Sequence, residues 1–201
     1  MKYKAIGFDY GGVIKGKPNS VFRSAVCDLL GVSVAEYQNA YFKHNKKINI
    51  DSVTWESFWA DVLNELGQSP NRAPEIMELS KATFGQPINT EVLELIEAIR
   101  RNNLKTGLLS NNTRNAADSM RHNSIDEYFD VFHVSGETGH MKPSREAYEL
   151  FAKDLDVPLS QLIFVDDSES SLSSAEMLGY TPILFDSLAG LRSKLVSMGV
   201  L

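Results

Sequence analysis

Cysteine, basic runs and long apolar stretches are scarce in this sequence. Its 201 residues include one cysteine, Cys27, so no intrachain disulfide can form and we expect a reducing compartment. Lys and Arg number 20 against 26 Asp and Glu, which gives a net charge of −6, and no basic run exceeds two residues. Because nucleic-acid binding usually requires a clustered basic face, we expect no nucleic-acid partner.

Membrane segments are also missing. No apolar run approaches the roughly 18 residues that a membrane-spanning helix needs. The sequence as given opens on a strand pattern rather than on a basic and then apolar leader. We therefore expect a cytoplasmic protein without a membrane partner, and nothing in the sequence specifies its oligomeric state. The 43% hydrophobic content suffices for one sizeable core with a small appended domain.

Short apolar runs alternate with stretches of helical spacing. The first run leads to Asp9, and similar runs cover residues 104–110, 131–135, 162–167 and 181–185. Helical spacing is found over residues 91–101, 144–154, 169–178 and 188–198. This alternation predicts an α/β fold, a Rossmann-like parallel sheet flanked by helices. Such sheets bind ligands at the carboxyl ends of their strands.

The segment from residue 16 to 85 interrupts this alternation with a helical pattern. Ser33 and Glu36 fit a capping box, and Pro74 suits the first turn of a helix. Apolar residues from Trp55 onward repeat along one helical face. We therefore expect a core domain made of residues 1–15 and 86–201, with a helical domain of residues 16–85 inserted between them.

Polar side chains collect at the ends of the expected strands. Asp9 ends the first, Ser110-Asn111-Asn112-Thr113 ends the second, Lys142 follows the next one, and Asp166-Asp167 end another. Each group alone has a structural explanation as a turn former, a helix cap or a solvated surface residue. Together they place acids, a hydroxyl, amides and a lysine on one edge of a parallel sheet.

Four segments, in this order, carry a resemblance to a known family. "FDYGGVI", "LLSNN", "HMKPSREAY" and "FVDDSESSLSSAEMLGYTPILF" resemble the four motifs of the haloacid dehalogenase superfamily. The helical insert is similar to the C1 cap of the subfamily with sugar-phosphate phosphatases, phosphoglycolate phosphatases and 2-haloacid dehalogenases. The first motif alone is weakly specific, whereas the fourth is specific and the complete set covers essentially the whole chain.

The resemblance implies hydrolysis of a small phosphorylated metabolite, such as a sugar phosphate, through an aspartyl-phosphate. Asp9 would be the nucleophile that attacks phosphorus. Ser110 would bind a phosphoryl oxygen, and the backbone N–H of Asn111, at a helix start, would add a second donor. Lys142 would neutralise the charge shared by Asp9 and the phosphoryl group.

The same resemblance implies a Mg²⁺ site. Asp9 and Asp166 would bind the ion, and Asp167 would be a ligand directly or through water. The main-chain carbonyl of Gly11 would be a further ligand. Cation and lysine together would offset the repulsion between an anionic nucleophile and an anionic ester.

Gly11 departs from the family pattern. Phosphatases of this family usually carry there a second aspartate, which protonates the leaving group and later deprotonates water. A positioned acid or base contributes roughly 10²–10⁴-fold in rate. His140, two residues before Lys142, could partly replace it, but a loop histidine that faces solvent is the plainer interpretation.

Three interpretations of the missing acid remain open. The first, which we favour, is a working phosphatase whose substrates have leaving groups that need little protonation, such as anomeric sugar phosphates, acyl phosphates or aryl phosphates. The second is a 2-haloacid dehalogenase, although those enzymes typically show serines in place of Asp166 and Asp167 and an aspartate in place of Ser171. The third is a non-catalytic or weakly active domain that binds a phosphorylated ligand or a protein partner.

Overall fold

A single parallel sheet organises the larger part of the chain. The computed structural model describes residues 2–16, 20–83 and 87–201. The strand order is β3-β2-β1-β4-β5, with β1 at the centre. The strands are Ala5–Phe8 (β1), Lys105–Ser110 (β2), Val131–Val134 (β3), Leu162–Asp166 (β4) and Thr181–Leu184 (β5). The predicted strands and the predicted fold class are confirmed.

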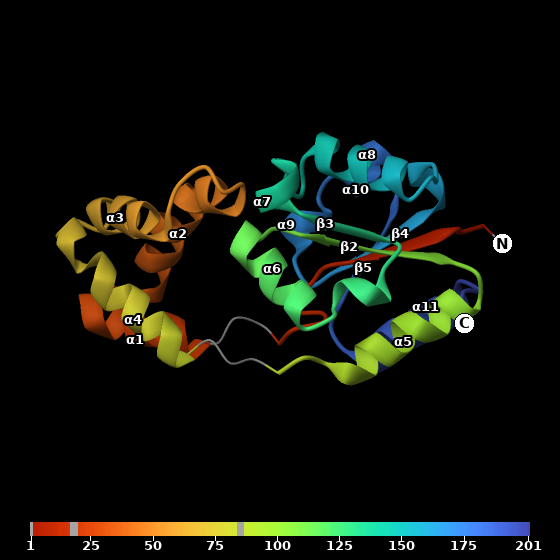
Figure 1. Cartoon of the computed structure of the whole chain (residues 1–201), viewed down its shortest axis with the longest axis horizontal. Coiled ribbons are helices and arrows are strands. Elements are labelled where there is room, and N and C mark those ends of the chain that lie inside the picture. Colours follow the sequence, from red (N-terminus) through yellow and green to blue (C-terminus); the bar gives the residue numbers. More distant parts are fainter. Residues whose placement is uncertain (1, 17–19, 84–86) are drawn as a thin grey trace.

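Helices cover both faces of this sheet (Figure 1). One face packs against α5, α6 and α11, and the other against α8, α9 and α10. The helices are Thr90–Arg101 (α5), Arg114–His122 (α6), Ser135–Thr138 (α7), Arg145–Asp154 (α8), Glu169–Leu172 (α9), Ala175–Leu178 (α10) and Leu188–Ser197 (α11). Single 3₁₀ turns span Asp126–Tyr128 and Leu159–Gln161.

The predicted single helix over residues 169–178 is wrong, because the chain forms two short helices there. The break falls at Ser173 and Ser174, and the Ser173 hydroxyl donates to the main-chain carbonyl of Ser170 over 2.8 Å. Serine side chains compete with the helical hydrogen-bond pattern in this way. The other three predicted helices of this part are confirmed within about one residue at each end.

Two facing glycines determine how closely α8 lies on the sheet. Gly7 of β1 pairs with Gly107 of β2, and the Phe151 ring of α8 covers both. A Cβ atom at Gly7 would lie 2.6 Å from that ring, and one at Gly107 would lie 2.5 Å from it. The absence of both side chains therefore lets the helix that follows Lys142 approach the central strands.

Helices alone form the insert, and they have their own apolar core. The helices are Ser20–Leu30 (α1), Val34–Asn49 (α2), Trp55–Glu65 (α3) and Ala73–Thr83 (α4), with a 3₁₀ turn at Pro70–Arg72. The capping box is confirmed, since Ser33 and Glu36 exchange the expected hydrogen bonds. Phe58, Trp59 and Val62 are buried on the predicted face of α3.

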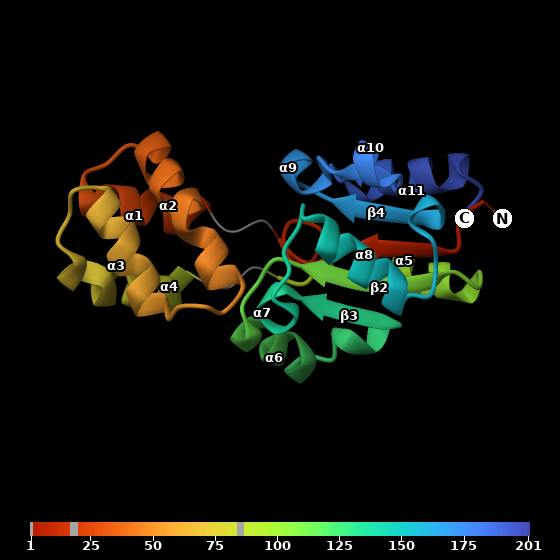
Figure 2. The same cartoon turned by 90° about the horizontal axis from the view of Figure 1, so that it is seen from above.

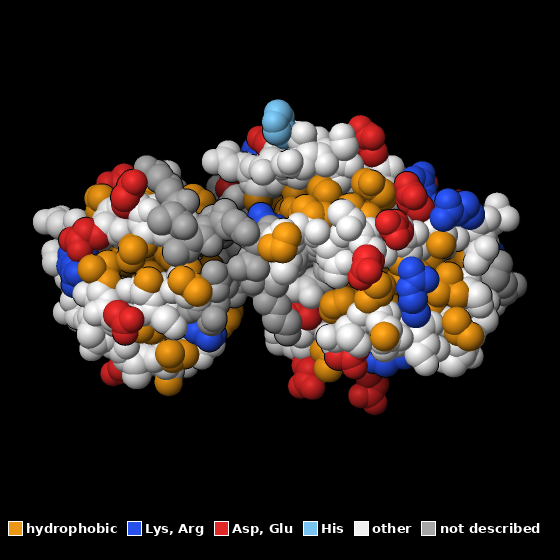
Figure 3. Space-filling model, turned by 90° about the horizontal axis from the view of Figure 1, so that it is seen from below, with side chains coloured by type: hydrophobic (Ala, Val, Ile, Leu, Met, Phe, Trp, Pro, Cys, Tyr) orange, Lys and Arg blue, Asp and Glu red, His pale blue; other side chains and the backbone are white. Residues whose placement is uncertain are grey.

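The insert faces the carboxyl ends of the strands (Figures 1 and 2). The predicted division of the chain into two domains stays a prediction, since its second boundary, at residues 85/86, lies outside the described residues. Acidic and basic side chains are interspersed with apolar ones on the face shown in Figure 3. Within the described residues, no helix has both the length and the apolar character needed to cross a bilayer.

Candidate active site

Strand register brings two aspartates together. Phe8 pairs with Val165 in the parallel β1–β4 ladder, so Asp9 and Asp166 occupy the next positions on neighbouring strands. The N–H of Asp9 donates to the Val165 carbonyl over 2.8 Å and continues this alignment. Asp9 and Asp166 are far apart in the sequence, but the pairing of β1 with β4 makes them neighbours.

Lys142 lies between these two carboxylates. Its ammonium nitrogen is 2.8 Å from Oδ1 of Asp9 and 2.6 Å from Oδ2 of Asp166. The side chains of Lys142 and Asp166 are each 1% exposed, and that of Asp9 is 14% exposed. Buried charges this close stabilise one another only as a set, so the three groups form one electrostatic unit.

Burial raises the pKa of Asp9 to about 6; the Lys142 ammonium opposes this shift, and the Asp166 carboxylate adds to it. Burial alone would lower the pKa of Lys142, but the two carboxylates outweigh it and the pKa is raised. Lys142 therefore stays protonated. A divalent cation next to Asp9 would favour its carboxylate form further.

A third acid completes an oxygen-rich cluster. Asp9, Asp166 and Asp167 each offer a carboxylate oxygen, and these oxygens lie within 4.8 Å of one another. Gly12 has φ +80°, and a Cβ atom there would overlap the carboxylate of Asp167. This glycine leaves the space that the Asp167 side chain occupies. Hard oxygen donors at this spacing fit Mg²⁺, which prefers carboxylates and water.

Asp166 is held by a further contact that the sequence analysis did not use. Its Oδ1 accepts from the N–H of Ser168 over 2.9 Å. Aspartates commonly accept from the backbone two residues on, so the "DDS" order could have indicated this turn. One Asp166 oxygen is thus bound to the backbone while the other binds Lys142.

Ser110 ends β2, and Asn111 follows it at the same edge of the sheet. Ser110 is buried at the last position of β2, next to Val134 of β3. The expected helix start at Asn111 is wrong, because α6 begins at Arg114 with Thr113 as its N-cap. The chain first needs three residues to turn out of the strand, and the Thr113 hydroxyl accepts the capping hydrogen bond.

The Asn111 side chain instead binds the main chain of Lys142. Its amide donates to the Lys142 carbonyl over 2.9 Å, and its Oδ1 accepts from the Lys142 N–H over 2.8 Å. This pair of bonds fixes the backbone from which Lys142 reaches the two aspartates. Sequence spacing gave no signal for it, because the partner is a main-chain group 31 residues away.

Replacing Asn111 with alanine should impair the site through Lys142. We expect Asn111→Ala to lower kcat/KM for a phosphate ester about 10-fold and unfolding stability by about 1–2 kcal/mol, because two partly buried hydrogen bonds are lost. Asn102→Ala is the matched control, since the Asn102 amide donates to the Val200 carbonyl over 3.1 Å. Steady-state kinetics and urea unfolding measure both effects; an equal loss of activity in the control would contradict the assignment.

Open space lies at Gly11, where the family pattern places its second acid. A Cβ atom added at Gly11 would meet no heavy atom within 4 Å. His140, the candidate replacement, is exposed on the loop before Lys142, and its main chain bonds Thr138. That exposure matches a histidine that faces solvent.

The fold agrees with comparisons to known proteins. A family model described as haloacid dehalogenase-like hydrolase matches residues 3–179. The chain therefore belongs to the haloacid dehalogenase-like hydrolases.

Individual relatives are distant but cover nearly the whole chain. It is 24% identical to Phosphatase MT3486 of Mycobacterium tuberculosis over 92% of this chain and 88% of the relative. It is 25% identical to the D-ribitol-5-phosphate phosphatase of Bacteroides thetaiotaomicron, covering 88% and 89%. A haloacid dehalogenase family enzyme of Bacteroides thetaiotaomicron, solved with magnesium and inorganic phosphate, superposes with a TM-score of 0.65 at 19% identity over 94% and 98%.

Proposed function

We propose that this chain is a Mg²⁺-dependent phosphatase that hydrolyses a small phosphorylated metabolite through an aspartyl-phosphate on Asp9. The observation that carries this proposal is the buried Lys142 ammonium between Asp9 and Asp166, 2.8 and 2.6 Å away. The nearby Asp167 and the phosphatase relatives support it.

Asp9 and Lys142 have different roles in the first step. A carboxylate oxygen of Asp9 attacks phosphorus, and the bond from phosphorus to the leaving oxygen breaks, so the leaving group departs with the electron pair. Lys142 holds Oδ1 of Asp9 in place. Ser110 would bind a phosphoryl oxygen. Mg²⁺, when bound by Asp9, Asp166 and Asp167, supplies positive charge that reduces the repulsion between nucleophile and ester.

The second step returns the enzyme to its starting state. Water attacks phosphorus of the aspartyl-phosphate and the bond from phosphorus to the Asp9 oxygen breaks. Inorganic phosphate leaves with the protons of the water, and the Asp9 carboxylate is regenerated. No side chain at Gly11 moves a proton in either step. Phosphates with good leaving groups, such as anomeric sugar phosphates, acyl phosphates or aryl phosphates, should therefore be the best substrates.

Hydrolysis should depend on the cation. We expect the purified chain to hydrolyse p-nitrophenyl phosphate and acetyl phosphate with Mg²⁺, and to lose about 10²-fold or more of that rate with excess EDTA, because the charge that offsets repulsion is removed. Release of inorganic phosphate measures the rate, and added Mg²⁺ should restore it. Rates that are indifferent to the chelator would contradict the proposed metal dependence.

The same assay separates the two alternatives. No turnover of any ester, together with Mg²⁺-dependent binding of phosphate, would favour a domain that only binds a phosphorylated ligand. Halide release from 2-haloacids without a metal would favour a dehalogenase. The convergence of Asp166 and Asp167 on Asp9 argues against that last function, since three carboxylates beside the Lys142 ammonium leave negative charge that a metal cation would offset.

A further inference from the structure

Ser135, the first residue of α7, connects the helical insert to the loop after β2. Its hydroxyl donates to the main-chain carbonyl of Asn49, at the end of α2, over 2.5 Å. It also accepts from the N–H of Asn112 over 2.9 Å. Ser135 is 0% exposed. A buried hydroxyl therefore has the insert on one side and the loop that follows Ser110 on the other.

The hydroxyl of Ser135 has a second acceptor available. The Asn112 carbonyl lies 3.2 Å from its oxygen, farther than the Asn49 carbonyl. A hydroxyl carries one proton, so the shorter contact receives it while the insert is docked. If Asn49 moves away, the hydroxyl can rotate to Asn112 and remain satisfied. Docking and release of the insert thus leave no unpaired buried hydroxyl.

Main-chain packing makes α7 and this loop move together. The N–H of Gly136 donates to the Asn112 carbonyl over 2.8 Å. A Cβ atom at Gly136 would lie 2.5 Å from the backbone nitrogen of Arg114 and 3.0 Å from the Asn112 carbonyl oxygen. Backbones in such close contact cannot slide past one another, so a shift of α7 displaces the loop.

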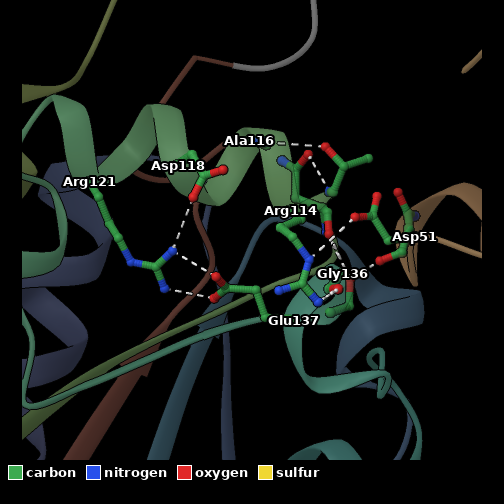
Figure 4. A network of polar contacts seen from close by, with 11 residues as sticks. Asp51, Arg114, Ala116, Asp118, Arg121, Gly136 and Glu137 are labelled. Atoms are coloured by element: carbon green, nitrogen blue, oxygen red, sulfur yellow. Dashed lines mark hydrogen bonds and ion pairs between the residues drawn. The ribbon is translucent and has the colours of Figure 1, made fainter. Parts of the chain in front are cut away.

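Ion pairs join α6 to the insert and to α7 (Figure 4). Arg114 points toward Asp51 of the insert, with Nε 3.7 Å from its carboxylate, and also donates to the Gly136 carbonyl over 3.2 Å. Arg121 of α6 holds Glu137 of α7 through two bonds of 2.6 and 2.7 Å. The Arg114 side chain is 57% exposed, so its pair with Asp51 is weak and sensitive to salt.

We infer that Ser135 is a positioning residue that couples docking of the insert to the phosphate-binding geometry of the loop. Asn112 directly follows Ser110 and Asn111, and Asn111 fixes the main chain of Lys142. The position of the insert is thereby transmitted to the groups that meet the phosphoryl oxygens. This inference rests on the proposed function, because that function assigns phosphate binding to the loop.

The first test measures docking without any turnover. Spin labels at Asn39→Cys and Lys153→Cys, both exposed sites, report the distance between insert and sheet in a Cys27→Ser background. Ser135→Ala should lengthen and broaden this distance distribution. Ser174→Ala, which removes another buried hydroxyl, next to Tyr180, should leave it unchanged. An unaltered distribution in Ser135→Ala would overturn the inference.

The second test measures the coupling to the loop. With Mg²⁺ present, calorimetric titration with inorganic phosphate should show about 10-fold weaker binding to Ser135→Ala and unchanged binding to Ser174→Ala. A longer distance without weaker phosphate binding would refute the coupling. Failure of the unmodified chain to bind phosphate would instead count against the proposed function.

A milder variant covers the case in which Ser135→Ala does not fold. Asp51 has φ +56°, a conformation that asparagine tolerates, so Asp51→Asn removes charge with little backbone strain. It should shift the distance distribution in the same direction and weaken phosphate binding about 2-fold, with a smaller effect at high salt. No shift at low salt would contradict the role of this contact.

Discussion

Asp9→Asn should abolish phosphate-ester hydrolysis, with a loss of roughly 10⁴-fold or more, because an amide oxygen cannot replace the nucleophilic carboxylate. The substitution keeps the shape of the side chain beside Lys142, which retains Asp166 at 2.6 Å. Initial rates with p-nitrophenyl phosphate and Mg²⁺ measure the effect. Quenched reactions should also show that phosphate becomes bound to the unmodified chain and not to this variant.

Asp154→Asn is the matched control for that experiment. The Asp154 carboxylate lies 2.9 Å from Nε2 of His133, at the end of α8 that is opposite to Lys142. Its rate should stay within about 2-fold of the unmodified chain, because no reacting group changes. Thermal unfolding of both variants establishes that they fold. Substantial turnover by folded Asp9→Asn would remove the basis of the proposed mechanism.

Gly11→Asp should create the proton donor that the sequence lacks. The open space at Gly11 can receive the side chain, and its φ lies outside the left-handed region. We expect kcat/KM to rise about 10- to 100-fold for an alkyl phosphate, near the lower end for general acid catalysis. The gain for p-nitrophenyl phosphate should be below about 3-fold, since p-nitrophenolate leaves without a proton.

Two comparisons make this prediction specific. Gly11→Asn adds a side chain of the same size that cannot act as a general acid, so it should give no gain with either ester. Gly12→Ala should weaken Mg²⁺ binding instead, because its Cβ would collide with Asp167 at a φ of +80°. Equal gains in Gly11→Asp for both esters would show that leaving-group protonation is not what the chain lacks.

The parts of the site that depend on strand order could be predicted from the sequence. Asp9 and Asp166 follow buried apolar runs, and parallel strands bring such ends to one edge. Lys142 precedes α8, and its position was implied by the family resemblance. These residues could be predicted because residue type and distance from a strand end determine where they lie.

Two further contacts could not be predicted because each joins a side chain to a main-chain group far away in the sequence. Asn111 binds the backbone of Lys142, and Ser135 binds the carbonyl of Asn49. Any residue type offers such groups, so no pattern in the sequence marks them. The break between α9 and α10 was missed for a related reason, since serine hydroxyls compete with the helical backbone.

The separate apolar core of the insert has an evolutionary consequence. Within the described residues, the cluster that includes Phe58 and Trp59 shares no member with the two clusters on the faces of the sheet. Mutations that reshape the insert can therefore accumulate without loosening the packing beneath Asp9. The insert and the residues around Asp9 can thus diverge at different rates in this chain.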